Sequence, residues 1–217
     1  MHRSVALLLT LVACGDDTAA IPDGGADATI DAAPITVTTE VVADGGPVHG
    51  TVAGDLVRFA GIPYAVATRF APPTAPAPWT TPRDASAFGP GCPQNNASMP
   101  QSEDCLSINV WAHAGTGSRP VIVWVHGGGY LEGSSRDPLY DGATLARTGE
   151  AIVVSFNYRL GVLGFLALPS LVAPDSGNGN WGLRDQIAAL AWVKRYAPLH
   201  PRVPSAYRRY RKDPESA

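Results

Sequence analysis

The residues with the clearest chemical potential are His126 and the three glycines that follow it, His126-Gly127-Gly128-Gly129. They come directly after Val121–Val125, an apolar and mostly β-branched run that is typical of a buried strand in a parallel sheet. Glycine lets backbone N–H groups approach a ligand with no Cβ in the way. Donors fixed before a reaction can stabilise negative charge that develops on a carbonyl oxygen. The pattern predicts an oxyanion hole, and the alternative is a glycine-rich loop that only reverses the chain.

Composition narrows the classes of protein to consider. The chain has 217 residues, a formal net charge of −3 and 45% hydrophobic residues, enough for one globular domain with its own core. The slightly acidic balance gives no reason to expect nucleic acid as a partner. No apolar run reaches the ~20 residues that a membrane span needs. The common metal and phosphate motifs do not occur in the chain, so we expect neither a metal nor a cofactor.

The first 34 residues divide into two segments. Residues 1–14 have a basic start, a short apolar core and small residues before Cys14, the layout of an export signal. Leu11-Val12-Ala13-Cys14 resembles the lipobox of bacterial lipoproteins, which implies a lipid on Cys14 that anchors the protein to the cell envelope. In a Gram-negative cell, Gly15 rather than Asp after the cysteine favours the outer membrane. The alternatives are an ordinary signal peptide, which would give a secreted protein, or a chance apolar stretch. Residues 15–34 are rich in Asp, Ala, Gly and Thr and predict a disordered tether.

Strand and helix patterns then alternate along the chain. The order predicts an α/β fold with a mostly parallel sheet and crossover helices. In the last helix, Leu183, Ile187, Leu190 and Lys194 share one face at helical spacing. The predicted strands are Ile35–Ala43, a hairpin over Val48–Phe59, a strand that ends at Trp111, Val121–Val125 and Ala151–Phe156, and the predicted helices are Leu139–Arg147 and Leu183–Tyr196.

Two cysteines remain after Cys14. Cys92 and Cys105 enclose a short loop, and export would bring them to an oxidising compartment where they can pair. The alternative is two free thiols.

Six groups of motifs follow one another between about residues 35 and 195. They are Gly61-Ile62-Pro63-Tyr64-Ala65, Arg69-Phe70, Glu103-Asp104-Cys105-Leu106, His126-Gly127-Gly128-Gly129-Tyr130, Asn157-Tyr158-Arg159, and Gly182-Leu183-Arg184-Asp185-Gln186 with Trp192-Val193. In this order they resemble the N-terminal part of the type-B carboxylesterases, the α/β-hydrolases that include cholinesterases and bacterial para-nitrobenzyl esterases. The resemblance implies an ester hydrolase whose substrate, in the full-length relatives, is a small-molecule ester.

The same resemblance implies roles for eight residues. They are the oxyanion-hole donors Gly128 and Gly129, the disulfide Cys92–Cys105, and the two structural ion pairs Arg69–Glu103 and Arg159–Asp185. Arginine suits such pairs because its planar fork meets a carboxylate with two hydrogen bonds. From the residues alone, the favoured interpretation of each pair is two separate solvated charges.

The chemistry of this fold also needs a nucleophilic serine in Gly-x-Ser-x-Gly, followed by an acid and a histidine. No glycine follows Gly182, so the motif does not occur in the region where related esterases carry it. Glu215-Ser216-Ala217 resembles the middle of the motif, but Pro214 replaces its first glycine. We therefore expect the chain as printed to lack the nucleophile, the acid and the catalytic histidine.

The C-terminal segment, residues 196–217, differs from the partial carboxylesterase domain over residues 35–195. From Lys194 onward there are seven Lys or Arg and two acids. This change inside a motif-rich region indicates a frameshift or a misplaced stop, and a basic tail for anionic lipid is the alternative.

These patterns predict a carboxylic-ester hydrolase by family that is truncated before its nucleophile and inactive as printed. One alternative is a non-catalytic, surface-exposed binding module, and another is a fragment that does not fold. In each case the central sheet is expected to end at an unpaired edge, which is an aggregation hazard.

Overall fold

The computed structural model describes residues 40–43, 45–95, 98–113, 119–148, 151–168, 170 and 179–196. The predicted signal peptide, tether and all but the first residue of the predicted basic tail lie outside these ranges. The chain divides into two units, Met1–Ala33 and Pro34–Ala217, and the second contains every described residue. Within that described part, no helix is both long enough and apolar enough to cross a membrane.

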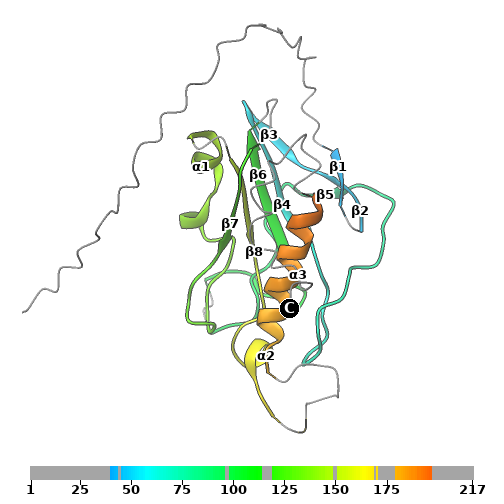
Figure 1. Cartoon of the computed structure of the whole chain (residues 1–217), viewed down its shortest axis with the longest axis vertical. Coiled ribbons are helices and arrows are strands. Elements are labelled where there is room, and N and C mark those ends of the chain that lie inside the picture. Colours follow the sequence, from blue (N-terminus) through cyan, green and yellow to red (C-terminus); the bar gives the residue numbers. More distant parts are fainter. Residues whose placement is uncertain are drawn as a thin grey trace, which may run out of the picture. The chain divides into compact units, whose positions relative to one another are not determined.

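A five-stranded sheet forms the framework (Figure 1). Its strands lie in the order β3 (Thr51–Ala53), β4 (Leu56–Pro63), β6 (Ser107–His113), β8 (Ile152–Phe156) and β7 (Val121–Val125). A second sheet contains β1 (Glu40–Ala43), β2 (Gly46–His49) and β5 (Arg83–Asp84).

The predicted α/β class is confirmed, but the described sheet is mixed rather than mostly parallel. The pairs β3–β4, β4–β6 and β6–β8 are antiparallel, and β7–β8 is parallel. Strands β3 and β4 form the predicted hairpin, whose tight turn allows only antiparallel pairing. Strands β7 and β8 are joined by a crossover that includes a helix, the kind of connection that parallel neighbours need.

The crossover contains two short helices where the sequence pattern predicted one. A 3-10 helix spans Pro138–Tyr140, and α1 spans Ala143–Thr148. The Asp137 carboxylate accepts a hydrogen bond from the N–H of Leu139, and the Asp141 carboxylate accepts one from the N–H of Ala143, both at 2.9 Å. Each aspartate satisfies a free donor at the start of a new helix, so the segment breaks between them.

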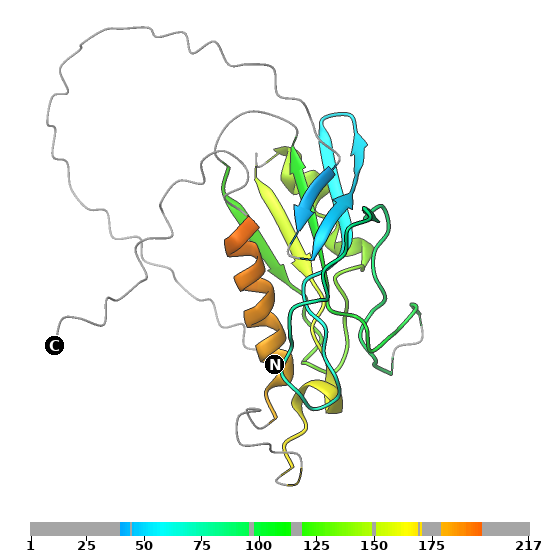
Figure 2. The same cartoon turned by 90° about the vertical axis from the view of Figure 1, so that its right-hand side faces the viewer.

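Two helices cover opposite faces of the sheet (Figures 1 and 2). On one face, Ala146 of α1 belongs to a buried cluster with Trp111 and Val153. On the other face, α3 (Trp181–Tyr196) adds Ala189 and Trp192 to the main core. Successive side chains of a strand point to opposite faces, so neighbouring residues of β8 serve different helices.

Helix α3 presents a different face to the core from the one its apolar spacing indicates. Leu183, Ile187 and Leu190 are exposed, and Ile187 retains 60% of its accessible surface. The buried face contains Trp181, Asp185, Ala189 and Trp192, together with Gly182 and Val193. Asp185 belongs to this face because an arginine partner compensates its charge.

Strand β7 forms as predicted, but the expectation that it is buried is wrong. Trp124 is 47% exposed, and Ile122 and Val125 are also exposed. The cause is the strand's position, because β7 is the last strand of the described sheet. All five residues of its neighbour β8 are buried.

Helix α2 (Gly161–Phe165) meets α3 with almost no space between their backbones and Arg159. A Cβ placed on Gly164 would lie 2.2 Å from the carbonyl oxygen of Arg159, and one on Gly182 would lie 2.4 Å from the same oxygen. Both positions therefore require glycine for close packing.

Candidate active site

The glycine loop, residues 126–133, begins at His126, directly after β7. Gly128 has φ of 116° and Gly129 has φ of 61°, in the left-handed region that favours glycine. A Cβ on Gly128 would lie 1.9 Å from the carbonyl oxygen of Glu132, whereas a Cβ on Gly129 would meet nothing within 4 Å. Gly128 is thus required by both space and backbone angle, and Gly129 by backbone angle alone.

The N–H groups of Gly128 and Gly129 are available to a ligand. Both residues are exposed, and no described residue accepts a hydrogen bond from either N–H group. The turn is closed through the carbonyl oxygen of Gly128, which accepts hydrogen bonds from the N–H groups of Leu131 (3.0 Å) and Glu132 (3.2 Å). This arrangement leaves two neighbouring donors free to receive an oxygen that carries negative charge.

Tyr130 extends the unusual backbone by one residue. Its φ of 64° lies in the left-handed region, which for a residue with a side chain costs about 1–2 kcal/mol. Three contacts hold it there, one of which is an edge-to-face contact with the ring of Tyr158 at 6.3 Å. Its carbonyl oxygen accepts a hydrogen bond from the N–H of Gly161 at 2.7 Å, and its ring lies 4.7 Å from the ring of Phe165.

His126 anchors the start of the loop. Only 2% of it is exposed, and its ring stacks on Tyr158 with the ring centres 4.4 Å apart. The Tyr158 hydroxyl donates to the carbonyl oxygen of His126 at 2.9 Å. Burial lowers the pKa of His126, which favours the neutral ring, and its Nδ1 lies 3.0 Å from the carbonyl oxygen of Gly127. Its role in this structure is to support the loop.

A buried asparagine fixes the chain just after the loop. The Asn157 side-chain oxygen accepts hydrogen bonds from the Ser134 hydroxyl (3.1 Å), the Ser135 N–H (2.8 Å) and the Ser135 hydroxyl (2.9 Å). Its side-chain nitrogen donates to the carbonyl oxygen of Pro90 at 2.9 Å. No sequence pattern assigned a role to these side chains, although Asn157 belongs to one of the six motif groups.

A second asparagine extends this network into the sheet. Asn109 of β6 donates to the hydroxyls of Ser135 (3.0 Å) and Ser155 (3.1 Å) and accepts from the N–H of Gly61 (2.9 Å). All three side chains are buried. The network fills the hydrogen-bonding capacity of polar groups that would otherwise destabilise the core.

The two cysteines are bonded to each other, and the inner charges, Arg159 and Asp185, form a buried ion pair. Cys92 and Cys105 form a disulfide with their Cα atoms 5.0 Å apart. Arg159 donates from Nε to Asp185 Oδ2 and from Nη2 to Asp185 Oδ1, each at 2.8 Å. The Asp185 side chain is fully buried, and the remaining Arg159 nitrogen donates to the carbonyl oxygens of Thr68 and Ala71.

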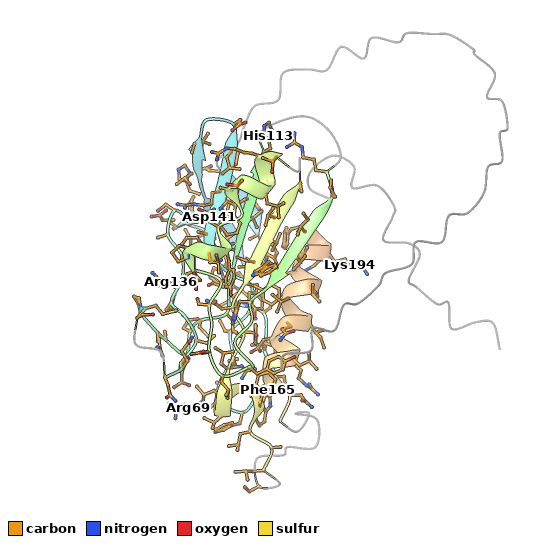
Figure 3. The ribbon with its side chains drawn as sticks, turned by 90° about the vertical axis from the view of Figure 1, so that its left-hand side faces the viewer. Arg69, His113, Arg136, Asp141, Phe165 and Lys194 are labelled. Atoms are coloured by element: carbon orange, nitrogen blue, oxygen red, sulfur yellow. A yellow bond between two sulfur atoms is a disulfide. The ribbon has the colours of Figure 1, made fainter. Side chains whose placement is uncertain are left out.

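The outer pair, Arg69 and Glu103, lies on the surface. Arg69 Nε donates to both Glu103 oxygens at 2.9 and 2.8 Å, and Arg69 Nη2 also contacts Oε1. The hydrogen bond from Arg69 lowers the pKa of Glu103, and the same contact raises the pKa of Arg69. Figure 3 shows Arg69 and Phe165 at the end of the molecule away from His113.

The described part of the chain does not bring together a nucleophile and a base. The Ser134 hydroxyl donates to the side-chain oxygen of Asn157, and within the described residues it makes no hydrogen bond with a histidine. Cys14 and Ser216 lie outside the described residues. Among the residues that are described, no group of three or more His, Cys, Asp or Glu could hold a metal ion.

Comparison with known sequences points to esterases. Residues 34–198 match the Carboxylesterase family. The fumonisin B1 esterase of Sphingopyxis macrogoltabida is 44% identical over 163 residues, covering 69% of this chain and 30% of the relative. The para-nitrobenzyl esterase of Bacillus subtilis (strain 168) is 44% identical over 162 residues, covering 69% of this chain and 33% of the relative. The chain thus spans about a third of the length of these relatives.

Comparison with solved structures also finds esterases. A PNB esterase superposes with a TM-score of 0.67 at 45% identity, covering 72% of this chain and 34% of the other. A thermophilic PNB esterase gives a TM-score of 0.69 at 40% identity, covering 75% of this chain and 36% of the other. With this sheet, this glycine loop and these relatives, the chain belongs to the carboxylesterase family and has its α/β-hydrolase fold.

Proposed function

We propose that this chain supplies the oxyanion hole of a carboxylic-ester hydrolase. The observation that carries the proposal is the pair of exposed N–H groups on Gly128 and Gly129, for which no described residue is an acceptor. When a nucleophile attacks an ester, the carbonyl oxygen becomes negatively charged, and two fixed donors stabilise that charge more strongly than they stabilise the ground state. The esterase relatives support the same chemistry.

The other half of the reaction needs a serine, a histidine and an acid. The 217 residues contain no Gly-x-Ser-x-Gly. We propose that the chain as printed binds a carbonyl oxygen weakly and does not turn an ester over, because an oxyanion hole without its nucleophile retains little of the catalytic acceleration. The substrate class is a small-molecule carboxylic ester.

We also propose that the protein is an exported lipoprotein held in the cell envelope through Cys14. The basic start and apolar core of residues 1–14 support export. The disulfide between Cys92 and Cys105 supports an oxidising compartment. Metabolic labelling with a fatty acid should mark the protein, and Cys14→Ser should abolish the label; a label that survives this change would contradict the proposal.

The first test is the DNA sequence from the codon of Val193 onward, translated in all three frames. The proposal expects one frame to contain Gly-x-Ser-x-Gly followed by a long continuation. If all three frames close without the motif, the chain does not belong to a working hydrolase.

The second test measures para-nitrophenol release from an activated ester. The printed chain should give no burst, and a burst that a serine-directed phosphonate abolishes would contradict this. In the longest product that contains the motif, Gly129→Ala should lower kcat at least tenfold relative to Gly54→Ala.

Gly54→Ala is a matched control for Gly129→Ala. Gly54 has φ of 65° and also has nothing within 4 Å of a Cβ, so both substitutions impose the same backbone strain in open space. Gly54 lies in the turn between β3 and β4, apart from the glycine loop. Equal losses of kcat in the two variants would show that the Gly129 effect is only a loss of stability.

A further inference from the structure

The disulfide loop is the segment between Cys92 and Cys105. A glutamine side chain from this loop binds Gly133, at the end of the glycine loop. Gln94 Nε2 donates to the carbonyl oxygen of Gly133 at 2.9 Å, and the Gly133 N–H donates to Gln94 Oε1 at 2.8 Å. One side-chain amide therefore satisfies both backbone groups of one residue that lies 39 positions away. Two simultaneous hydrogen bonds fix the orientation of Gly133 as well as its position.

Gly133 is the residue at which the loop closes on itself. Its φ is 113°, and a Cβ there would lie 2.3 Å from the carbonyl oxygen of Gly127 and 2.6 Å from Nδ1 of His126. The backbone of Gly133 thus packs directly against the two residues that lead into the loop. The position of Gly133 sets the distance between the two ends of the segment that carries Gly128 and Gly129.

The segment between those ends has few other restraints. The turn hydrogen bonds to the carbonyl oxygen of Gly128 are internal to it. The outside contacts are at Tyr130, whose carbonyl oxygen accepts from the N–H of Gly161 and whose ring contacts Phe165 and Tyr158. The direction of the Gly128 and Gly129 N–H groups therefore depends on how Tyr130 and the two ends of the loop are held.

Gln94 is itself held in place by the disulfide loop. Its backbone N–H donates to the side-chain oxygen of Gln101 at 2.8 Å, and its Nε2 also donates to the carbonyl oxygen of Cys92 at 3.1 Å. Cys92 is bonded to Cys105. A continuous path of covalent and hydrogen bonds connects the disulfide with Gly133.

We propose that Gln94 is a positioning residue for the oxyanion hole, which it serves by pairing with Gly133 and so aiming the N–H groups of Gly128 and Gly129. The inference rests on the proposed function of these two N–H groups. Its test uses no ester, so a failure of the hydrolase proposal and a failure of this one are distinguishable.

The test compares amide resonances and hydrogen-exchange rates in the ¹⁵N-labelled chain. Gln94→Met keeps the length of the side chain and removes its two hydrogen bonds to Gly133, together with the one to Cys92. We expect the exchange rate of the Gly133 amide to rise about tenfold, and the resonances of Gly128 and Gly129 to move. Those of Val153 and Val154 in the middle of β8 should stay in place. Gln186→Met is the control, because no described residue bonds to its Nε2.

A second variant tests the hydrogen bonds by restoring them. In Gln94→Glu, an ionised carboxylate accepts from the Gly133 N–H but cannot donate to the Gly133 carbonyl oxygen. Protonation, below an ordinary Glu pKa of about 4.3, returns one donor and one acceptor. When both proteins are measured at pH 7, the Gly128 and Gly129 resonances of the variant should differ from those of the unsubstituted chain. When both are measured at about pH 3.5, the difference should become smaller. A role in packing alone would not respond to this protonation.

Three results would overturn the proposal. In the first, the Gly128 and Gly129 resonances stay unchanged in both variants while the Gly133 resonance moves. In the second, the Gln94→Glu differences persist at low pH. In the third, the β8 amides lose protection in both variants, because Gln94 would then maintain the whole fold rather than aim one loop.

Discussion

Strands β7 and β8 lie side by side, run parallel and are both mostly β-branched, yet their environments differ. Val121–Val125 pairs residue by residue with Ile152–Phe156. Every residue of β8 is buried, whereas three of the five in β7 are exposed. The difference comes from neighbours, since β8 lies between β6 and β7 and β7 has a described neighbour on one side alone. An apolar run thus predicts a strand, and the number of its neighbours decides its burial.

The largest expected effect on stability extends this contrast between buried and exposed positions to the two ion pairs. Asp185→Ala would leave Arg159 as an uncompensated buried charge and should lower the free energy of unfolding by about 3–5 kcal/mol. Glu103→Ala breaks the exposed pair with Arg69 and should cause no measurable change, because solvent screens that pair. Urea titration of both variants measures the difference. Equal losses would show that the Arg69–Glu103 pair is buried in solution.

The next effect compares the two strands directly through one residue type. Ile152 of β8 is 5% exposed and Ile122 of β7 is 36% exposed. Ile152→Ala should cost about 2–5 kcal/mol of unfolding free energy. Ile122→Ala should cost less than about 1 kcal/mol. If the two losses match, β7 is covered in solution, and the contrast between the strands is not real.

A third prediction concerns self-association through the edge of the sheet. An unpaired apolar strand is a template for pairing with another chain. Trp124→Lys should lower the fraction of associated protein in sedimentation velocity at increasing concentration. Val162→Lys is the control, because Val162 is also apolar and exposed, at 65% against 47% for Trp124, but lies on α2. A similar decrease in both variants would assign the association to general hydrophobicity.

The smallest expected effect concerns His126, where the exposed strand β7 gives way to a buried residue. His126 follows the exposed strand β7 but is buried against Tyr158, which follows β8. Because burial lowers its folded-state pKa, the unfolded chain binds more protons between the ordinary value of 6.5 and the lowered value. Stability should therefore decrease as the pH falls through this window.

His126→Gln should flatten that part of the stability profile. His49 and His113 remain in both proteins, so the difference between the two profiles reports on His126. An unchanged slope below pH 6.5 would contradict the assignment of a lowered pKa to this residue.

The sequence predicts where strands and helices lie better than it predicts which of their faces is buried. The strand at Ile152–Phe156 and the helix at Trp181–Tyr196 follow from their patterns. The buried face of α3 could not be read in the same way, because it includes a charged residue, Asp185, and a small one, Ala189. The stronger apolar signal came from Leu183, Ile187 and Leu190, which are exposed. Only the partner Arg159 explains why Asp185 belongs inside.

In the candidate site, the sequence likewise predicts the glycine loop but not the side chains that support it. Glycines after a strand predict a loop with accessible N–H groups, because residue type alone determines where a Cβ is missing. The support from Gln94 and Asn157 has no such signal. Gln94 reaches Gly133 across 39 positions, and an amide side chain carries no periodicity that indicates a distant partner. A signal that could have been used is the proximity of Gln94 to Cys92, since a short disulfide loop restricts where its side chains can reach.

The close approach of Gly164 and Gly182 to the Arg159 carbonyl oxygen has a consequence for how this part of the molecule can change. Any side chain at either position would push a helix away from the same atom. A substitution that α2 could tolerate after a small shift would therefore demand a matching shift of α3. We therefore expect α2 and α3 to be exchanged together in recombination between relatives, and chimeras with a crossover point between them to be depleted among folded products.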